Sequence, residues 1–151
     1  MFCVAGGAIE INLLFRLRGN GGCPQARPSG QHQIWDCWLS EQIQYSTQYW
    51  DEQKQPQRKN FISRNLSYHG NTITTLSLSG HPARRRPYAE ILDHKNFHKV
   101  SPAYAKRFRY PEETEEQYVE RLRQELEDRF LELGPDTVIG CTSSPTLTGN
   151  S

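Results

Sequence analysis

The sequence predicts an α/β fold, in which short strands alternate with helices, and the arrangement is an incomplete one. Strand signals come from the apolar pair Phe61-Ile62, which follows a charged run, and from Val138-Ile139 near the end of the chain. A helix is indicated over residues 114–133, where apolar residues recur every three or four positions. One or two short strands are expected, with helices near residues 41–53 and 114–133.

The composition limits how much of the chain can be buried. A chain of 151 residues fits one ordinary domain, but its hydrophobic fraction of 35% and mean hydropathy of −0.79 are low for a globular domain. We therefore expect order over residues 41–140, a poorly ordered N-terminal region at 1–40 and a disordered polar tail at 141–151. The net charge of +1 argues against nucleic acid or an anionic membrane as a partner. No apolar run approaches the roughly 20 residues that span a bilayer.

The cysteines and the N-terminal residues indicate a protein that stays inside the cell. The four cysteines have wide, irregular spacings, without the CxxC pairs or Cys/His clusters that bind zinc. Reduced thiols are therefore expected. Glu10 and the lack of a basic region before the apolar run argue against a secretory signal. We predict a cytoplasmic location, and a mitochondrial presequence stays open as the alternative.

The first predicted helix covers residues 41–53. Ser40 is a candidate N-cap, and apolar or neutral side chains at Ile43, Thr47 and Trp50 follow one stripe. Pro56 ends this helix, because a proline disfavours helix in the residue before it. A strand over residues 61–64 is expected next.

The middle of the chain is less regular. Residues 73–78 have β-branched side chains that favour a strand, whereas Asn71 and Gly80 favour a helix with caps at its two ends. Arg84, Arg85 and Arg86 are predicted to lie in a solvated loop that pairs with nearby acids. Residues 91–110 show no sustained periodicity, so a loop is expected there, with a short extended piece at 97–100.

The segment after Pro111 is the best-defined helix in the sequence. Thr114 and Gln117 have the spacing of a capping box. Glu125 stands four residues before Arg129, the orientation that favours an ion pair. Gly134-Pro135 ends the helix. One apolar stripe for packing is formed by Tyr118, Leu122, Leu126, Phe130 and Leu133.

The turn at Tyr68-His69-Gly70 is the main candidate site. Gly70 can adopt positive φ without a steric cost, so the turn presents an aromatic ring and an imidazole together on a loop after a strand. By residue type alone, a plain surface turn with a half-buried tyrosine explains the same pattern. The sequence around the turn decides between these two interpretations.

Four segments in order over residues 48–140 resemble one known family. They are FISRNLSYHGNT at 61–72, LSLSGHPARRRPY at 76–88, FHKVSPAYAKRFR at 97–109, and the acidic helix that leads into LGPDTV at 133–138. Together these segments resemble part of the large domain of class-III pyridoxal-phosphate-dependent aminotransferases. The resemblance implies a partial type-I fold for residues 41–140, and it favours a helix over residues 73–78.

The resemblance also implies a cofactor and three residues that contact it. In the family, the aromatic residue before the His-Gly pair stacks on the pyridine ring of pyridoxal phosphate. By resemblance Tyr68 takes this role, with His69 beside it and Gly70 allowing close approach. Family members transfer an amino group from a donor to a 2-oxo acid or aldehyde, and they work as dimers. A homodimer, or pairing with a full-length subunit, is therefore implied.

The resemblance to this family also predicts that this chain alone does not catalyse transamination. Transamination needs a lysine for the Schiff base and an acid at the pyridinium nitrogen, and no lysine of this sequence stands in the family's context for that role. We interpret the chain as a truncated form or a product of a gene-model error. The rival interpretation is a non-enzymatic interaction or anion-binding module that uses Arg84, Arg85 and Arg86. A metal site at His94 and His98 would need a helix and further ligands, which are not evident.

Overall fold

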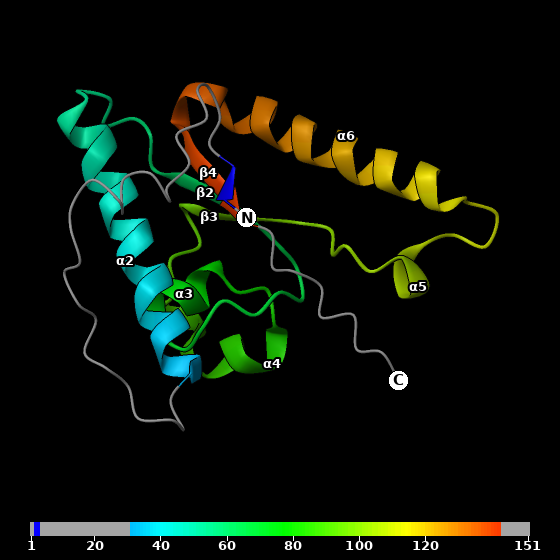
Figure 1. Ribbon diagram of the computed structural model, residues 1–151, viewed down its shortest axis with the longest axis horizontal. Helices are drawn as coiled ribbons and strands as arrows, with labels where there is room; N and C mark the ends of the chain where they lie inside the picture. Colours follow the sequence, from blue (N-terminus) through cyan, green and yellow to red (C-terminus); the bar gives the residue numbers. More distant parts are fainter. Residues whose placement is uncertain (1, 4–30, 143–151) are drawn as a thin grey trace.

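The computed structural model describes residues 2–3 and 31–142 (Figure 1). Its centre is a four-stranded sheet with the strand order β1-β4-β2-β3. Strand β2 lies between β3 and β4 and is parallel to both, whereas β1 is antiparallel to β4. The strands are β1 Phe2–Cys3, β2 Asn60–Arg64, β3 Phe97–Val100 and β4 Val138–Thr142. The predicted α/β class is confirmed.

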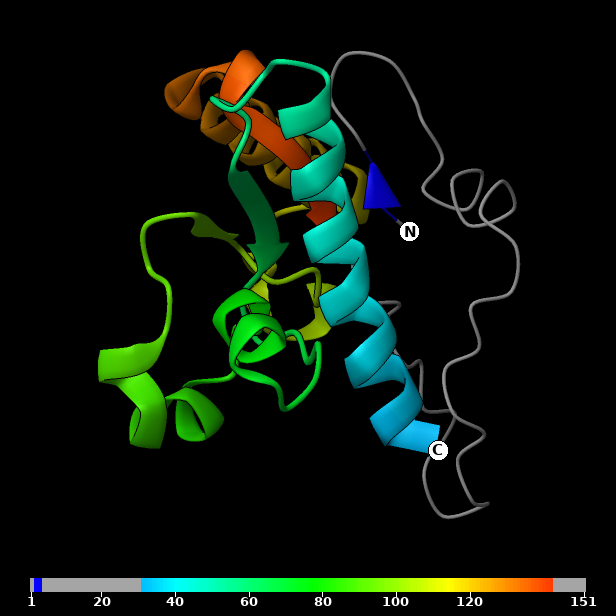
Figure 2. The same ribbon diagram turned by 90° about the vertical axis from the view of Figure 1, so that its left-hand side faces the viewer.

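Helices cover both faces of the sheet, so the described residues form three layers. On one face, Phe61 and Ile139 pack with Ile43 of helix α2 (Gln31–Glu52) and with Leu78 of α3 (Ile73–Leu78). On the other face, Ile62 packs with partly buried side chains of α6 (Glu115–Leu133). Figure 2 shows α2 in front of the sheet and α6 behind it. Neighbouring residues of β2 therefore belong to different cores, because strand side chains alternate between faces.

The first helix begins earlier than the sequence predicts. Helix α2 runs from Gln31 to Glu52, so it passes through Ser40, which is not its N-cap. The Ser40 hydroxyl instead shares a hydrogen bond of 2.6 Å with the Thr72 hydroxyl just before α3. The predicted end is close, and Lys54 then takes a left-handed conformation at φ 59°. The predicted boundary at residue 40 thus falls inside a helix, and the rest of the predicted disordered region, residues 1 and 4–30, lies outside the described residues.

Arg58 joins the end of α2 to the start of β4. Its side chain is buried, and its guanidinium lies 4.4 Å from the centre of the Trp50 ring. One nitrogen donates to the carbonyls of Pro135, at 3.1 Å, and Val138, at 2.9 Å. These acceptors compensate the buried charge, as a guanidinium away from water requires. The ion pair with Asp136 is longer, at 3.7 Å.

Residues 73–78 form a helix, as the resemblance favours. Helix α3 begins after Thr72, whose hydroxyl accepts a hydrogen bond from the Thr75 N–H, and it ends at Ser79. The predicted caps, Asn71 and Gly80, therefore each lie one residue outside the observed caps, Thr72 and Ser79. Thr72 fits the role because a threonine hydroxyl in an extended residue reaches the third N–H of a helix.

The segment 81–110 contains more regular structure than the predicted loop. It forms helix α4 (Pro82–Arg85), the 3₁₀ helix η1 (Arg86–Ile91) and helix α5 (Ala105–Phe108). These elements are only one or two turns long, too short to give a visible period in the sequence. The predicted extended piece at residues 97–100 is confirmed as β3.

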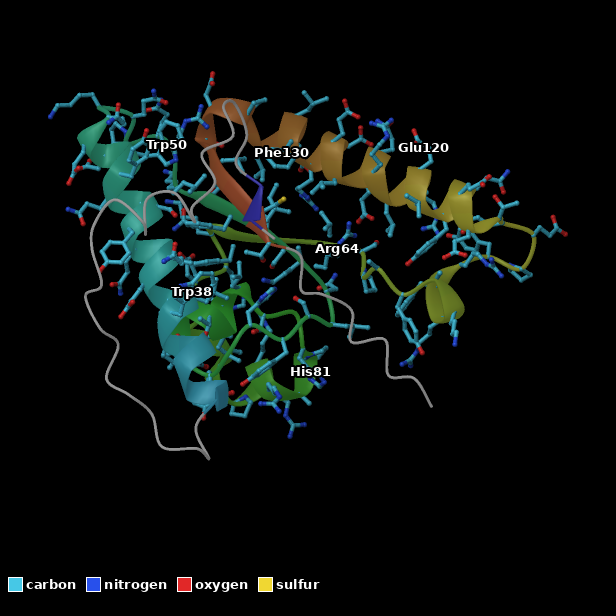
Figure 3. The ribbon with its side chains drawn as sticks, in the orientation of Figure 1. Trp38, Trp50, Arg64, His81, Glu120 and Phe130 are labelled. Atoms are coloured by element: carbon cyan, nitrogen blue, oxygen red, sulfur yellow. The ribbon has the colours of Figure 1, made fainter. Side chains whose placement is uncertain are left out.

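Helix α6 is predicted well, apart from one ion pair. Thr114 caps it with a full capping box to Gln117, and Leu126, Phe130 and Leu133 of the apolar stripe pack against the sheet (Figure 3 labels Phe130). The predicted pair of Glu125 with Arg129 is wrong. Glu125 accepts from both the N–H and the hydroxyl of Ser101, at 2.9 Å each, so it anchors the loop after β3 to the helix.

Strand β4 extends past the predicted break at residue 140. Cys141 and Thr142 continue the strand, because they pair with β2 on one side and with β1 on the other. The remainder of the predicted disordered tail, residues 143–151, lies outside the described residues. Among the helices of the described ranges, none is long and apolar enough to cross a membrane.

Candidate functional site

The Tyr68-His69-Gly70 turn lies between β2 and α3, where the chain leaves the carboxyl end of a central parallel strand. In open α/β sheets, ligands bind outside the carboxyl ends of the strands. Gly70 has φ 127°, so its predicted positive φ is confirmed. Leu66 also has positive φ, at 61°, and its N–H donates to the Gly80 carbonyl at 3.2 Å.

The Tyr68 ring is partly open to solvent. Its side chain is 36% exposed, and the Arg84 guanidinium lies over the ring at 4.7 Å from the ring centre. Arg84 also donates to the Asn71 side-chain carbonyl at 3.2 Å. The Tyr68 ring is therefore in a cation–π contact with Arg84 and keeps part of its surface exposed.

His69 fixes the turn to the sheet. Its ring Nε2 lies 3.3 Å from the Thr142 hydroxyl at the end of β4, and its backbone N–H donates to the Ser79 hydroxyl at 3.0 Å. Burial, aided by the positive charge of Lys99, lowers the pKa of His69 to about 4. The imidazole is therefore neutral at physiological pH. A neutral ring can share a hydrogen bond with a hydroxyl without bringing an uncompensated charge into the site.

Two basic side chains, Arg85 and Lys99, lie at the carbonyl end of α3. The Arg85 guanidinium donates to the carbonyls of Ser79, at 2.6 Å, and Ser77, at 2.7 Å. The Lys99 ammonium donates to the same Ser77 carbonyl at 2.9 Å, to the Leu78 carbonyl and to the Ser63 hydroxyl at 2.8 Å. Positive charge at a helix C-terminus is favourable, because the unpaired carbonyls there carry partial negative charge.

The Lys99 amine shares its surroundings with another charge. Burial, followed by repulsion from Arg85, lowers the pKa of Lys99 to about 7. Its hydrogen bonds tie β3 to β2 and α3, so the side chain supports the floor of the site. The sequence does not predict this role, because residues 77, 85 and 99 come together only after the chain has folded.

The other predicted candidates do not form a site. His98 points Nε2 at the Asn60 side-chain oxygen, at 3.3 Å, and His94 contacts the Ala89 carbonyl at 2.9 Å. Within residues 2–3 and 31–142, no group of three or more possible ligands is close enough to hold a metal ion. The three arginines of the predicted loop also separate, because Arg85 turns inward to α3 while Arg84 lies on Tyr68.

Comparisons with curated proteins find aminotransferases. No family model matches the chain. An aminotransferase of Gibberella zeae is 40% identical over 113 residues, which cover 74% of this chain and 22% of that protein. An uncharacterized aminotransferase of Schizosaccharomyces pombe is 43% identical over 91 residues, 60% of this chain and 20% of that protein. The chain thus spans about a fifth of the length of these relatives.

Solved structures agree with the sequence relatives. A thermostable omega transaminase mutant from Pseudomonas jessenii has a TM-score of 0.65 and 31% identity, covering 69% of this chain and 23% of that one. The omega-transferase from Vibrio fluvialis has a TM-score of 0.65 and 26% identity over 71% of this chain and 24% of that one. Both solved structures share the fold over about 70% of this chain, and the four relatives are 26–43% identical to it over the matched residues. The chain belongs to the pyridoxal-phosphate-dependent aminotransferases and carries part of their large domain.

Proposed function

We propose that this chain supplies the part of a class-III aminotransferase that stacks on the pyridine ring of pyridoxal phosphate, with Tyr68 as the stacking residue. The observation that carries this proposal is the position of the ring. Tyr68 is partly exposed on a turn at the carboxyl end of β2, and the partly buried His69 beside it is hydrogen-bonded to Ser79 and to Thr142 of β4. Such a ring keeps one orientation when a flat ligand arrives.

The residues of the turn fit the cofactor. An exposed aromatic ring can bury a face of the pyridine ring and fix its plane. Gly70, at φ 127°, has no side chain to limit the approach of the ligand to the backbone. When bound, pyridoxal phosphate supplies an electron sink for carbanion chemistry. The protein's own task is to orient that ring.

His69 and Thr142 keep the stacking residue in place. The hydrogen bonds of His69 reach the start of the loop after α3 and the last residue of β4. Because the imidazole stays neutral well below pH 7, this link persists across the physiological range. We assign His69 and Gly70 to positioning of Tyr68 and to close packing against the cofactor.

We propose further that the 151-residue polypeptide on its own does not catalyse transamination. The sequence has five lysines, all within the described residues. Lys99 is bound to backbone carbonyls, and the other four, Lys54, Lys59, Lys95 and Lys106, are exposed. The reaction needs an amine placed to form the Schiff base and to move a proton. Groups outside this sequence, on a longer chain or a second subunit, would have to supply it.

Substrate and location follow only by analogy with the relatives. The name of one relative, 38% identical over 92 residues from Oryza sativa, describes a mitochondrial gamma-aminobutyrate transaminase. We propose an amino donor and a 2-oxo acid or aldehyde acceptor for the complete enzyme, and dimerisation as its assembly. A cytoplasmic location stays a prediction from the sequence.

Binding of pyridoxamine 5′-phosphate to the full chain tests the stacking role. This probe keeps the ring and phosphate but has no aldehyde that could react with the lysines. Tyr68→Ala should weaken binding about five- to tenfold, because one stacked aromatic pair is lost. Tyr68→Phe should bind as the unaltered chain does. The control is Tyr45→Ala on α2, where the ring is 47% exposed and distant in sequence from the turn. Equal affinities for Tyr68→Ala and the control would refute the proposal.

Turnover of an amino donor with pyruvate or 2-oxoglutarate tests the second proposal. The purified chain with pyridoxal phosphate should give no rate above that of free pyridoxal phosphate. A clear rate that disappears when one of the five lysines is replaced would overturn it.

A further inference from the structure

Two cysteines stand directly opposite each other at one side of the sheet. In the antiparallel pair of β1 with β4, Cys3 is opposite Cys141, and Phe2 is opposite Thr142 (Figure 1). Directly opposite residues of such a pair share one face of the sheet, and their Cα atoms are about 4.5 or 5.5 Å apart. A disulfide needs a Cα separation of about 4.4 to 6.8 Å. The backbone register therefore places the two cysteines within reach of one disulfide.

Strand β1 is attached to the sheet by few backbone contacts. It has two residues, whereas β4 has five, and it neighbours β4 on the side away from β2. A pair of this length adds few ladder hydrogen bonds. A strand edge with unpaired backbone groups is also open to pairing with other chains. A covalent bond to β4 would therefore hold β1 on this edge far more firmly than the ladder does.

Cys141 belongs to a well-packed part of the sheet. Its side chain is half-buried and packs against the cluster of Ile62, Val100 and Val138. The next residue, Thr142, has its hydroxyl 3.3 Å from the Nε2 of His69. A bond at Cys141 would therefore restrain the end of β4 that contacts the His69 turn.

We propose that Cys3 and Cys141 are a redox-sensitive pair, which forms a disulfide under oxidising conditions and so locks β1 to β4. With glutathione disulfide as the oxidant, the thiolate of one cysteine attacks a glutathione sulfur, and the bond between the two glutathione sulfurs breaks. The thiolate of the second cysteine attacks the cysteine sulfur of this mixed disulfide and releases the second glutathione. The cysteines lose two electrons and two protons, which leave in two glutathione thiols. Neither cysteine takes part in the proposed cofactor contact.

Disulfide mapping of the full chain tests this assignment. The dilute protein is equilibrated in glutathione buffers with a rising share of glutathione disulfide, and the remaining thiols are trapped with iodoacetamide. Mass spectrometry of the digest then identifies the linked peptides. Other pairings can form, because the sequence also has cysteines at 23 and 37. We expect the peptide pair that joins Cys3 to Cys141 to be the main disulfide, and dithiothreitol should remove it.

Urea unfolding measures the effect of the bond on stability. Oxidation should raise the urea midpoint of the unaltered chain by about 1 M, because a bond from residue 3 to residue 141 closes a long loop and lowers the entropy of the unfolded chain. Cys3→Ser should show no rise. It is preferred to Cys141→Ser, which would place a hydroxyl against the buried cluster. The matched controls, Cys23→Ser and Cys37→Ser, should show the same rise as the unaltered chain.

Several results would overturn the assignment. Oxidation that joins Cys3 or Cys141 mainly to Cys23, to Cys37 or to glutathione would show that β1 and β4 do not bring this pair together. A disulfide mainly between two chains, seen as a dimer on a non-reducing gel, would show the same. An equal rise of the midpoint in Cys3→Ser would assign the stabilisation to another pair of cysteines.

Discussion

Gly80 shows how a single residue sets the path of the chain around the site. A Cβ at this position would lie 2.6 Å from the Asn65 Cα and 2.7 Å from the Arg64 carbonyl oxygen, both backbone atoms. Leu66 and Gly80 are also hydrogen-bonded to each other, at 3.2 Å. The loop after β2 and the loop after α3 therefore cross in direct backbone contact, which only glycine permits.

We expect Gly80→Ala to destabilise the chain by about 3 kcal/mol, because backbone atoms must move to admit the methyl group. Gly134→Ala is the comparison. Gly134 has φ 85°, but a Cβ there meets only a side-chain methyl of Thr137 at 3.6 Å, so about 1 kcal/mol of backbone strain is expected. Urea unfolding measures both. Equal stabilities of Gly80→Ala and the unaltered chain would show that the two loops do not cross as described.

His69 makes the stability of the fold depend on pH. Burial, with a contribution from Lys99, lowers the pKa of His69 in the folded chain to about 4, below its ordinary value of 6.5. Between these two pH values the unfolded chain binds more protons than the folded chain. The free energy of unfolding therefore rises as pH increases from 4 to 6.5, and this contribution is lost as the pH falls through that range.

Replacing His69 with Gln should flatten this rise, because glutamine keeps a hydrogen-bonding group but does not titrate. Urea unfolding at intervals from pH 4 to pH 7 measures the slope. The exposed His81, replaced by Gln, is the control and should leave the slope unchanged. An unaltered slope in His69→Gln would contradict the burial of this imidazole.

The sequence identifies some of these residues and not others, for a physical reason. Gly70 could be predicted because a glycine between His69 and Asn71 in a turn is a local signal of positive φ. Lys99 and Arg85 could not be predicted as partners of the α3 carbonyls. Their roles depend on contacts between segments distant in sequence, and an isolated lysine or arginine in a polar stretch carries no sign of them.

At the scale of elements, α6 is held mainly by its cap and by its apolar stripe. Its outer face is covered by exposed ion pairs such as Arg123 with Glu120 and Glu127 (Figure 3 labels Glu120). Exposed pairs of this kind contribute little to stability. The Thr114 capping box satisfies two backbone N–H donors, those of Thr114 and Gln117, and Tyr118 and Leu122 are buried just after it.

Thr114→Ala should therefore destabilise the chain by about 1 kcal/mol, while Thr114→Ser, which keeps the hydroxyl, should cost much less. Arg123→Ala serves as a surface control on the same helix, with an expected change below about 0.5 kcal/mol. Thermal and urea unfolding provide the comparison. A larger loss in Arg123→Ala than in Thr114→Ala would reverse this ranking of cap over ion pairs.

Element boundaries were predictable where local chemistry marks them. The start of α6 follows from Thr114 and Gln117, whose side chains cap it, and the strand at residues 61–64 follows from the apolar pair Phe61-Ile62. The start of α2 was missed, because Ser40 resembles an N-cap and its hydroxyl is used instead by Thr72 of another segment. The sequence predicts an ion pair of Glu125 with Arg129, but in the fold the Glu125 carboxylate accepts a hydrogen bond from Ser101, a residue distant in sequence.

For the molecule as a whole, β2 joins the two cores and leads directly into the site. Phe61 belongs to the core under α2 and α3, and Ile62 belongs to the core under α6. The turn that carries Tyr68 begins a few residues after β2, which is covered on both faces of the sheet. A loop that starts from a buried strand holds its binding group in a defined position. The family resemblance located this turn in the sequence, and the packing explains why it holds its shape.

Backbone amide resonances of the ¹⁵N-labelled chain, recorded as pyridoxamine 5′-phosphate is added, test the central claim most directly. If the Tyr68 turn contacts the cofactor ring, the largest shifts should fall on residues 68–71. Amides on the outer face of α6, such as those of Glu127 and Asp128, should not move. Shifts gathered around the exposed Lys95 and Lys106, with residues 68–71 unchanged at saturation, would contradict the claim that this turn is the cofactor contact.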